Sequence, residues 1–164
     1  MSEQSDWERW LAEHVPVLLL FARQQTRCEA DAQDVLQEAA IESWERQGQG
    51  QLPPLPFVFA TIRRRAIDLA RTNERRASRE SAAGADSPQS WFDSSAEDRE
   101  RSRMLQQAMT SLPEIYRDVI TLKIWAGLTF TQIADALDIP ANTAASRYRY
   151  GLEQLRRTTR EILA

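Results

Sequence analysis

The sequence predicts an all-α protein made of two small helical domains joined by a flexible linker. Nearly every apolar cluster in the 164 residues follows a helical spacing, and no segment shows the sustained alternation that is typical of a strand. A stretch rich in Ser, Ala, Asp and Gly has no sustained periodicity and separates two helical blocks. We therefore expect domains at residues 1–76 and 101–164, with a linker at residues 77–100.

Three helices are expected in the first block. Apolar residues at helical spacing mark the opening stretch: Trp7, Trp10, Leu11, Val15, Leu18 and Phe21. Pro16 marks a kink or a restart in this stretch, because proline disrupts a helix interior. A second helix is expected from about Glu29 to Arg46. The breaker run QGQGQLPPLP follows, and a third helix is expected from about Phe57 to Arg76.

The linker and two further helices come next. Trp91 and Phe92 interrupt the polarity of the linker, and packing on a partner, on a domain surface or elsewhere on this chain all remain open. One helix is expected to carry Met104, Leu105, Ala108 and Met109, and another, from Pro113 to Trp125, to carry Ile115, Val119, Ile120 and Leu122. Gly127 suits a helix C-terminus.

Composition narrows the classes of function. Hydrophobic residues make up 42% of the chain, but no apolar run is long enough for membrane insertion. The N-terminus lacks the pattern of a signal peptide, and a single cysteine, Cys28, fits a reducing cytoplasm. With one histidine, His14, the chain offers no zinc ligand set, catalytic grouping or phosphate-binding glycine loop. We expect a cytoplasmic protein that is not an enzyme and needs no metal or cofactor.

The stretch from Leu128 to Arg156 has the pattern of a helix-turn-helix. Thr129 and Gln132 have the spacing of a capping box, and Asp138-Ile139-Pro140 is expected to end one helix and start the next. In the second helix one stripe is expected to be buried: Ala144, Tyr148, Leu152 and Leu155. The other side is polar and basic, as in a helix that enters a DNA groove. Its candidate DNA-binding residues are Asn142, Thr143, Ser146, Arg147, Arg149 and Tyr150. An ordinary helical hairpin with solvated arginines remains an alternative.

The run FVFATIRRRAIDLARTNERR interleaves aromatic and aliphatic residues with arginines. Such a mixture suits single-stranded DNA, because rings and guanidinium planes stack on unpaired bases while the charges bind the backbone. The candidates are Phe57, Arg63, Arg64, Arg65 and Arg71. Alternatively Phe57, Phe59 and Ile62 are core residues and the arginines are solvated surface.

Acidic residues recur at three- and four-residue steps along the second helix. They are Asp31, Asp34, Glu38, Glu42 and Glu45. A solvated face and a docking site for a basic protein partner are equally good interpretations. The first fifty residues hold ten acidic side chains and four arginines, whereas residues 57–79 and 141–160 are strongly basic. Charge is thus segregated along the chain despite a net charge of −3, and DNA binding should depend on a partner that docks on the acidic part.

Three motifs carry a family resemblance: DAQDVLQEAAIESW, FVFATIRRRAIDLAR and the stretch from Ser111 to Arg156. Together they resemble bacterial sigma factors of the extracytoplasmic-function group, the smallest members of the RNA polymerase sigma family, over nearly the whole chain. The chain departs from the family pattern at Phe57, Arg64, Asp138 and Ala145, which leaves the promoter sequence open.

The resemblance implies a role for each motif. Asp34, Gln37 and Glu38 of the first would bind the clamp helices of the polymerase β′ subunit, and the candidate protein-binding set is Asp31, Asp34, Gln37, Glu38 and Glu42. The second motif would recognise and melt the −10 element. The third would bind the −35 element through its helix-turn-helix and the β flap through its upper helices. Core RNA polymerase, promoter DNA and an inhibitory anti-sigma factor are the implied partners.

Two rival functions remain. A dimeric helix-turn-helix regulator explains the C-terminal motif equally well, but it leaves the arginine-rich helix and the acidic stripe without a role, and it predicts tight duplex binding without polymerase. A purely helical adaptor is the other rival.

Overall fold

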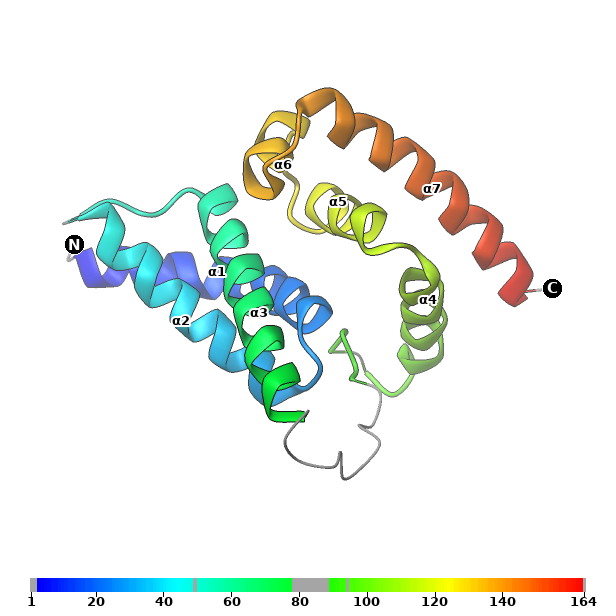
Figure 1. Cartoon of the computed structure of the whole chain (residues 1–164), viewed down its shortest axis with the longest axis horizontal. Helices are drawn as coiled ribbons and strands as arrows, with labels where there is room; N and C mark the ends of the chain where they lie inside the picture. Colours follow the sequence, from blue (N-terminus) through cyan, green and yellow to red (C-terminus); the bar gives the residue numbers. More distant parts are fainter. Residues whose placement is uncertain (1–2, 49, 78–88, 94, 164) are drawn as a thin grey trace. The chain divides into compact units, whose positions relative to one another are not determined.

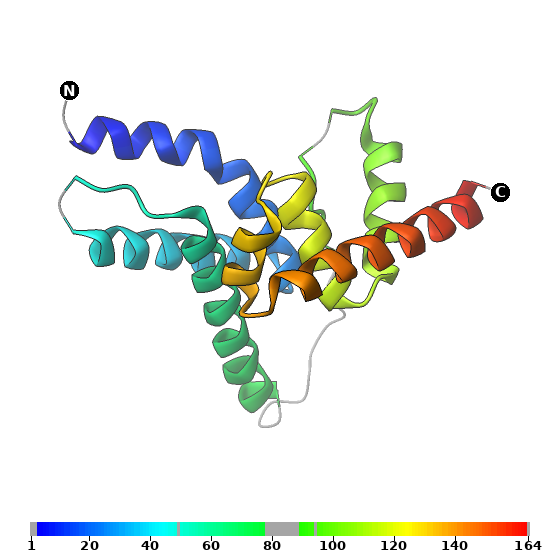
Figure 2. The same ribbon diagram turned by 90° about the horizontal axis from the view of Figure 1, so that it is seen from above.

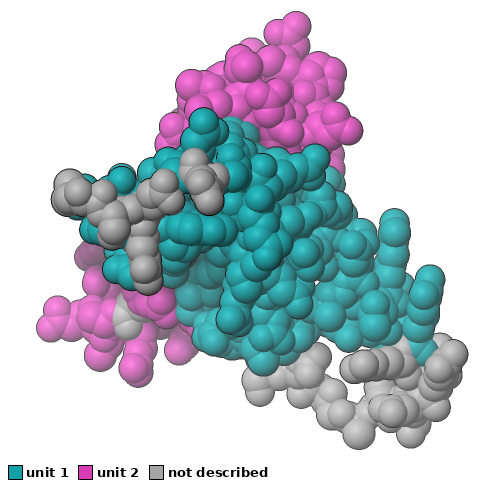
Figure 3. All heavy atoms as spheres, turned by 90° about the vertical axis from the view of Figure 1, so that its left-hand side faces the viewer, with its two compact units in different colours: residues 1–89 teal, residues 90–164 magenta. Residues whose placement is uncertain are grey.

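The structure, a computed structural model, describes residues 3–48, 50–77, 89–93 and 95–163. These ranges contain seven α-helices and no strand, which confirms the predicted all-α class (Figure 1). The helices are α1 (Glu3–Gln25), α2 (Glu29–Gln47), α3 (Leu55–Ala77), α4 (Arg99–Ser111), α5 (Glu114–Ile124), α6 (Phe130–Leu137) and α7 (Ala141–Leu163). They divide into two compact units, Met1–Gln89 and Ser90–Ala164 (Figure 3).

The first unit is a bundle in which α1, α2 and α3 each pack against the other two (Figure 1). Phe21 of α1 and Phe59 of α3 are fully buried, and their rings meet edge to face with centroids 5.3 Å apart. Burial of one such side chain stabilises the fold by about 1.5–3 kcal/mol. Ile62 is also fully buried, so Phe59 and Ile62 belong to the core and are not available to stack on unpaired DNA bases. Their burial fixes which side of α3 remains accessible.

Helix α1 continues through Pro16 without a restart. A proline removes the bond from its own nitrogen to the carbonyl four residues earlier. Pro16 and Ala12 are both exposed, so water can reach the carbonyl that lacks its usual donor. Of the two alternatives for Pro16, a kink or a restart, the continuous helix excludes the restart.

A partly buried ion pair joins the end of α1 to the start of α2. The Arg23 side chain is 9% exposed, and its Nε and Nη2 lie 2.8 and 2.9 Å from the two carboxylate oxygens of Glu29. The hydrogen bond from Arg23 is the main reason why the pKa of Glu29 is lowered to about 2. This bidentate contact holds the short connection between the two helices.

In the second unit α7 packs against α4, α5 and α6 (Figure 2). Gly151 of α7 is buried, and an added Cβ would lie 2.9 Å from Ile120 Cδ1 and 3.1 Å from Tyr116 Cβ. The close approach of α5 and α7 thus requires a residue without a side chain. Of the predicted buried stripe on α7, only Ala144 is fully buried, whereas Tyr148, Leu152 and Leu155 are half-buried.

Local signals place the turns around α6 as predicted. Gly127 has a positive φ of 68°, and the Thr129–Gln132 capping box is formed in both directions, with N···O distances of 2.9 and 3.1 Å. Asp138 ends α6 in the left-handed conformation, with φ 55°. That conformation costs most residues roughly 1–2 kcal/mol, but aspartate adopts it more readily than most. The helix-turn-helix geometry is therefore encoded locally.

The C-terminal part of the predicted linker belongs to the second unit. Trp91 is 8% exposed, its backbone N–H donates to Gln106 Oε1 at 2.9 Å, and the Arg117 guanidinium lies 5.4 Å from its ring centroid. Phe92 contacts the ring of Trp125. Of the three alternatives, packing back on this chain is the one observed. The central part of the predicted linker, residues 78–88, lies outside the described residues.

Candidate nucleic-acid and protein-binding surfaces

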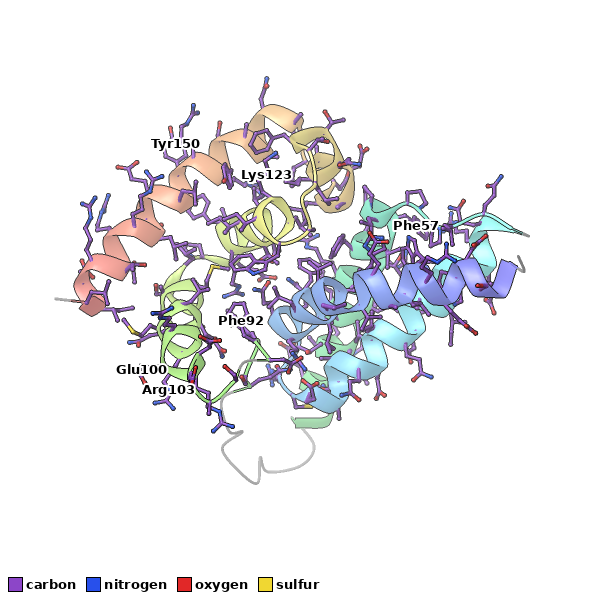
Figure 4. The ribbon with its side chains drawn as sticks, turned by 180° about the vertical axis from the view of Figure 1, so that it is seen from behind. Phe57, Phe92, Glu100, Arg103, Lys123 and Tyr150 are labelled. Atoms are coloured by element: carbon purple, nitrogen blue, oxygen red, sulfur yellow. The ribbon has the colours of Figure 1, made fainter. Side chains whose placement is uncertain are left out.

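The predicted duplex-binding residues gather at the N-terminal half of α7. Asn142, Thr143, Ser146, Arg147 and Tyr150 line one shallow hollow of about 300 Å³, together with Ile115 and Tyr116 from α5. Arg149 does not line the hollow but is exposed, and its guanidinium carbon lies 5.8 Å from the Tyr150 ring centroid. The Tyr150 side chain extends from α7 (Figure 4). The six candidates thus form one polar and basic face, which we call the α7 face.

Ile115 is a member of this site that the sequence analysis named only among the apolar residues of the predicted helix from Pro113 to Trp125. Its side chain is 47% exposed, whereas Val119, Ile120 and Leu122 on the same helix are fully buried. Ile115 lies in the first turn of α5, and its four-residue spacing to Val119 predicts the same side of the helix. Helical spacing therefore could not reveal its exposure.

The predicted strand-binding residues surround much of α3. Arg64 and Arg71 are exposed, whereas Arg63 and Arg65 are half-buried. Consecutive helical residues diverge by about 100°, so the three adjacent arginines cannot face a single ligand. Phe57 lies near the start of α3 (Figure 4) and is half-buried. The Arg46 guanidinium lies 5.3 Å from the Phe57 ring centroid.

Two of these arginines form ion pairs with the acidic stripe of α2. Arg64 Nη2 lies 2.6 Å from Glu42 Oε1, Arg65 Nε lies 3.0 Å from Glu42 Oε2, and Arg65 Nη1 lies 3.0 Å from Glu38 Oε2. We call these four residues the α2–α3 ion-pair cluster. The acidic and basic charges are segregated along the chain, but folding brings two carboxylates of α2 against two guanidinium groups of α3.

The cluster shifts the pKa values of its central members. Burial by itself would raise the pKa of Glu42, but the hydrogen bonds and charges of Arg65 and Arg64 outweigh it and lower that pKa. Burial likewise would lower the pKa of Arg65, but Glu42 and Glu38 outweigh it and raise that pKa. Both shifts favour the charged forms of Glu42 and Arg65, so the ion pair between these two residues persists near neutral pH.

The remaining candidates on α2 lie on its accessible side. Asp34, Gln37 and Glu38 are exposed, and Asp31 is half-buried. Gln37 also lines an apolar groove of about 840 Å³ between α1 and α2. The groove residues are Trp7, Leu11, Val15, Leu19, Gln33, Leu36, Gln37, Ala40, Ile41, Trp44 and Glu45.

Ile41 and Trp44 are groove residues that the predicted protein-binding set does not include. They are 51% and 39% exposed, which is high for such large apolar side chains. Trp44 also packs edge to face on Trp7, with ring centroids 4.5 Å apart. The signal was present in the sequence, because Gln37, Ile41 and Trp44 are spaced by four and three residues, beside the acidic stripe. An apolar groove next to exposed acids is typical of a protein-docking surface.

Comparison with known protein families identifies both units. Residues 10–76 match the family described as sigma-70 region 2, and residues 102–155 match sigma-70, region 4. The chain is 30% identical over 133 residues to the ECF RNA polymerase sigma factor SigK of Mycolicibacterium vanbaalenii, covering 77% of this chain and 67% of that protein. It is 28% identical over 158 residues to the ECF RNA polymerase sigma factor SigL of Mycobacterium tuberculosis, covering 92% and 86%.

Solved structures support the same fold. The sigma factor RpoE in complex with the anti-sigma factor NepR from Bartonella quintana matches with a TM-score of 0.70 and 19% identity, covering 94% of this chain and 97% of that one. CnrH in complex with the cytosolic domain of CnrY matches with a TM-score of 0.64 and 19% identity, covering 93% and 86%.

Region 2 followed by region 4 defines the class of protein, a two-domain factor of the sigma-70 type. The chain belongs to the extracytoplasmic-function sigma factors, and its function is that of a sigma factor in transcription initiation. Within the described ranges, no helix combines the length and the apolar character that crossing a membrane requires.

Proposed function

We propose that this sigma factor docks on core RNA polymerase through α2, binds the −35 element as duplex through α7, and helps to open the −10 element through α3. The observation that carries the proposal is the gathering of five of the predicted duplex-binding residues in one hollow on the α7 face. The sequence predicted these residues on one face of a helix, and in the fold that face borders a hollow to which Ile115 and Tyr116 of α5 contribute.

For polymerase docking, the proposed surface has an acidic and an apolar part. Asp34 and Glu38 supply exposed carboxylates, and the neighbouring groove supplies Ile41 and Trp44. Buried aromatic side chains contribute much of the binding energy at protein interfaces, whereas exposed charges contribute mainly to orientation and rate. The clamp helices of the β′ subunit are the proposed partner of this surface. The upper helices of the second unit are proposed to bind the β flap.

For the −35 element, the α7 face combines small polar residues with arginines. Asn142 and Ser146 leave space for the helix to approach base edges, while Arg147 and Arg149 can donate to guanine or phosphate. Within the described residues that line the hollow, none is acidic. The face is therefore electrostatically suited to duplex DNA.

For the −10 element, α3 is proposed to hold the unpaired strand through Phe57, Arg63, Arg64, Arg65 and Arg71. Phe57 remains partly accessible for stacking, and Arg64 and Arg71 are exposed. The ion pairs of Arg64 and Arg65 with α2 imply that a strand must compete with carboxylates for these two side chains. DNA binding by α3 should therefore be weak in the free protein.

We also propose an anti-sigma factor as a partner. The cytoplasm is the proposed compartment in which the chain binds all these partners. The proposal is supported by a structure of the same fold, the sigma factor RpoE, which was solved in complex with the anti-sigma factor NepR. A protein that covers the α2 surface or the α7 face would prevent initiation.

Transcription in vitro with purified core polymerase tests the docking surface. Asp34→Lys reverses an exposed charge outside the α2–α3 ion-pair cluster, so it should weaken association with core polymerase and reduce transcripts together. The double reversal Glu8→Lys/Glu13→Lys changes exposed acids of α1 and serves as control. Equal loss in both variants, or retained association in Asp34→Lys, would contradict docking through α2.

A further inference from the structure

Glu42 differs from the other members of the acidic stripe. Its side chain is 26% exposed, against 58% for Glu38, and both of its carboxylate oxygens are hydrogen-bonded to arginines of α3. A basic group of a docking protein would have to displace Arg64 or Arg65 to reach it. Glu42 is therefore poorly placed as a protein contact, although it belongs to the same sequence pattern as Asp34 and Glu38.

The contacts of Glu42 instead define where two arginines lie. One oxygen accepts from Arg64 Nη2 and the other from Arg65 Nε, so a single carboxylate fixes two adjacent guanidinium groups. Arg65 Nη1 donates in addition to Glu38. Arginine side chains are long and mobile in solution, and a planar guanidinium held by charge-assisted hydrogen bonds is oriented before any ligand arrives.

We propose that Glu42 is a positioning residue for the promoter strand, which acts through Arg64 and Arg65 and does not contact polymerase. The inference rests on the proposed −10 function of α3 and adds to it a determinant of sequence specificity. Glu42 holds the two guanidinium groups in one arrangement and neutralises part of their charge. A DNA strand that fits this arrangement is therefore bound in preference to other strands.

Two physical effects then predict the same outcome when the carboxylate is removed. Loss of orientation weakens binding of the correct strand, because the arginines must be ordered during binding. Loss of neutralisation strengthens binding of any strand, because sequence-independent affinity increases with the positive charge that meets phosphates. Both effects lower the ratio of specific to non-specific affinity.

The experiment uses holoenzyme assembled from core polymerase and either the full-length wild-type chain or Glu42→Gln. The probes are a fluorescent single strand, the non-template strand of a promoter that wild-type holoenzyme opens, and the same bases in scrambled order. We expect the affinity ratio of the two probes to fall roughly fivefold or more in Glu42→Gln. The slope of log affinity against log salt should steepen by roughly 0.7 for each charge released. Association with core polymerase should change less than about twofold.

Three comparisons separate positioning from other roles. Glu13→Gln removes the same charge from an exposed position of α1 and should leave the affinity ratio unchanged. In an Arg64→Gln/Arg65→Gln background, Glu42→Gln should have no further effect on the ratio, which a merely structural role would not predict. Should Glu42→Gln fail to fold, Glu42→Asp, which keeps the charge but shortens the reach, provides the same test and should also lower the ratio.

The outcomes are distinguishable. Weaker core association with an unchanged ratio would show that Glu42 is a polymerase contact and would overturn the inference. An unchanged ratio with unchanged association would overturn it as well. If wild-type holoenzyme itself binds the two probes equally, the proposed −10 function of α3 fails, and with it the basis of the inference.

Discussion

The two nucleic-acid surfaces of this sigma factor have the same basic residue type in opposite electrostatic settings. On the α7 face, Arg147 lies in a hollow whose described lining contains no acid. On α3, Arg64 and Arg65 each lie within 3.0 Å of a carboxylate of α2. Duplex DNA can therefore bind Arg147 without displacing an acidic residue that lines the hollow. A single DNA strand, in contrast, must compete with the carboxylates of α2 for Arg64 and Arg65. The number of arginines in a segment is therefore a poor guide to its affinity for DNA.

The largest effect is expected from the core of the first unit. Phe21→Ala removes a fully buried ring that packs on Phe59, and such truncations cost about 3–5 kcal/mol. This is comparable to the total stability of so small a unit, so α1–α3 should unfold while α4–α7 remain folded. Amide spectra by NMR can follow both units, with Ile41→Ala, an exposed apolar position, as control. Simultaneous unfolding of both units would show that the two surfaces are not independently supported.

Gly151→Val should disturb the α7 face indirectly, through the contact between α7 and α5. The new side chain would collide with Ile120 and with the Cβ of Tyr116, and overpacking of this kind costs about 1–3 kcal/mol. Because Tyr116 lines the hollow, duplex binding by holoenzyme should weaken together with thermal stability. Glu153→Val introduces the same side chain at an exposed position of α7 and should affect neither property. Normal duplex binding by Gly151→Val would separate the hollow from DNA recognition.

Arg149→Ala tests the exposed part of the α7 face. If this side chain contacts a base, binding of a −35 duplex by holoenzyme should weaken by about 1–3 kcal/mol and discrimination should relax at one base pair. Uniform weakening across all sequences would assign Arg149 to phosphate. An unchanged footprint would remove it from the site.

The Arg23–Glu29 pair should make the first unit sensitive to acid. Because the pKa of Glu29 in the folded state is lowered to about 2, its contribution is complete above the ordinary value of 4.5 and is lost as pH falls toward 2. The Glu29 side chain is 43% exposed, so screening limits the effect to on the order of 1 kcal/mol. Urea unfolding of wild type and Glu29→Gln between these pH values should show the difference. Parallel pH profiles would contradict the pairing.

The smallest predicted effect concerns Ile115. Its exposed side chain in the hollow is suited to the 5-methyl group of thymine, the main apolar feature of the major groove. Deoxyuridine in place of one −35 thymine should then cost wild-type holoenzyme about 0.8 kcal/mol and cost Ile115→Ala nothing further. Ile124→Ala, equally exposed on α5 but outside the hollow, should behave as wild type. Insensitivity of wild type to every such methyl deletion would exclude this contact.

Interactions between residues close together in the chain could be predicted from the sequence, whereas interactions between distant residues could not. Helical periodicity, the Thr129–Gln132 capping box and the turns at Gly127 and Asp138 depend on residues close together in the chain, and they were predicted closely. The pairs of Arg64 and Arg65 with Glu42 join residues 22 and 23 positions apart, and no local pattern contains them. The packing of Trp91 on Arg117 and the exposure of Ile115 likewise depend on which helices become neighbours.

Probing a promoter with permanganate, with and without core polymerase, tests most directly whether strand capture depends on docking. With core polymerase, thymines of the −10 element should become reactive and the −35 duplex should be protected; the isolated chain at the same concentration should produce neither change. If the isolated chain protected a duplex tightly as a dimer, and core polymerase added no reactive thymines, the account of a docking-dependent factor would be contradicted.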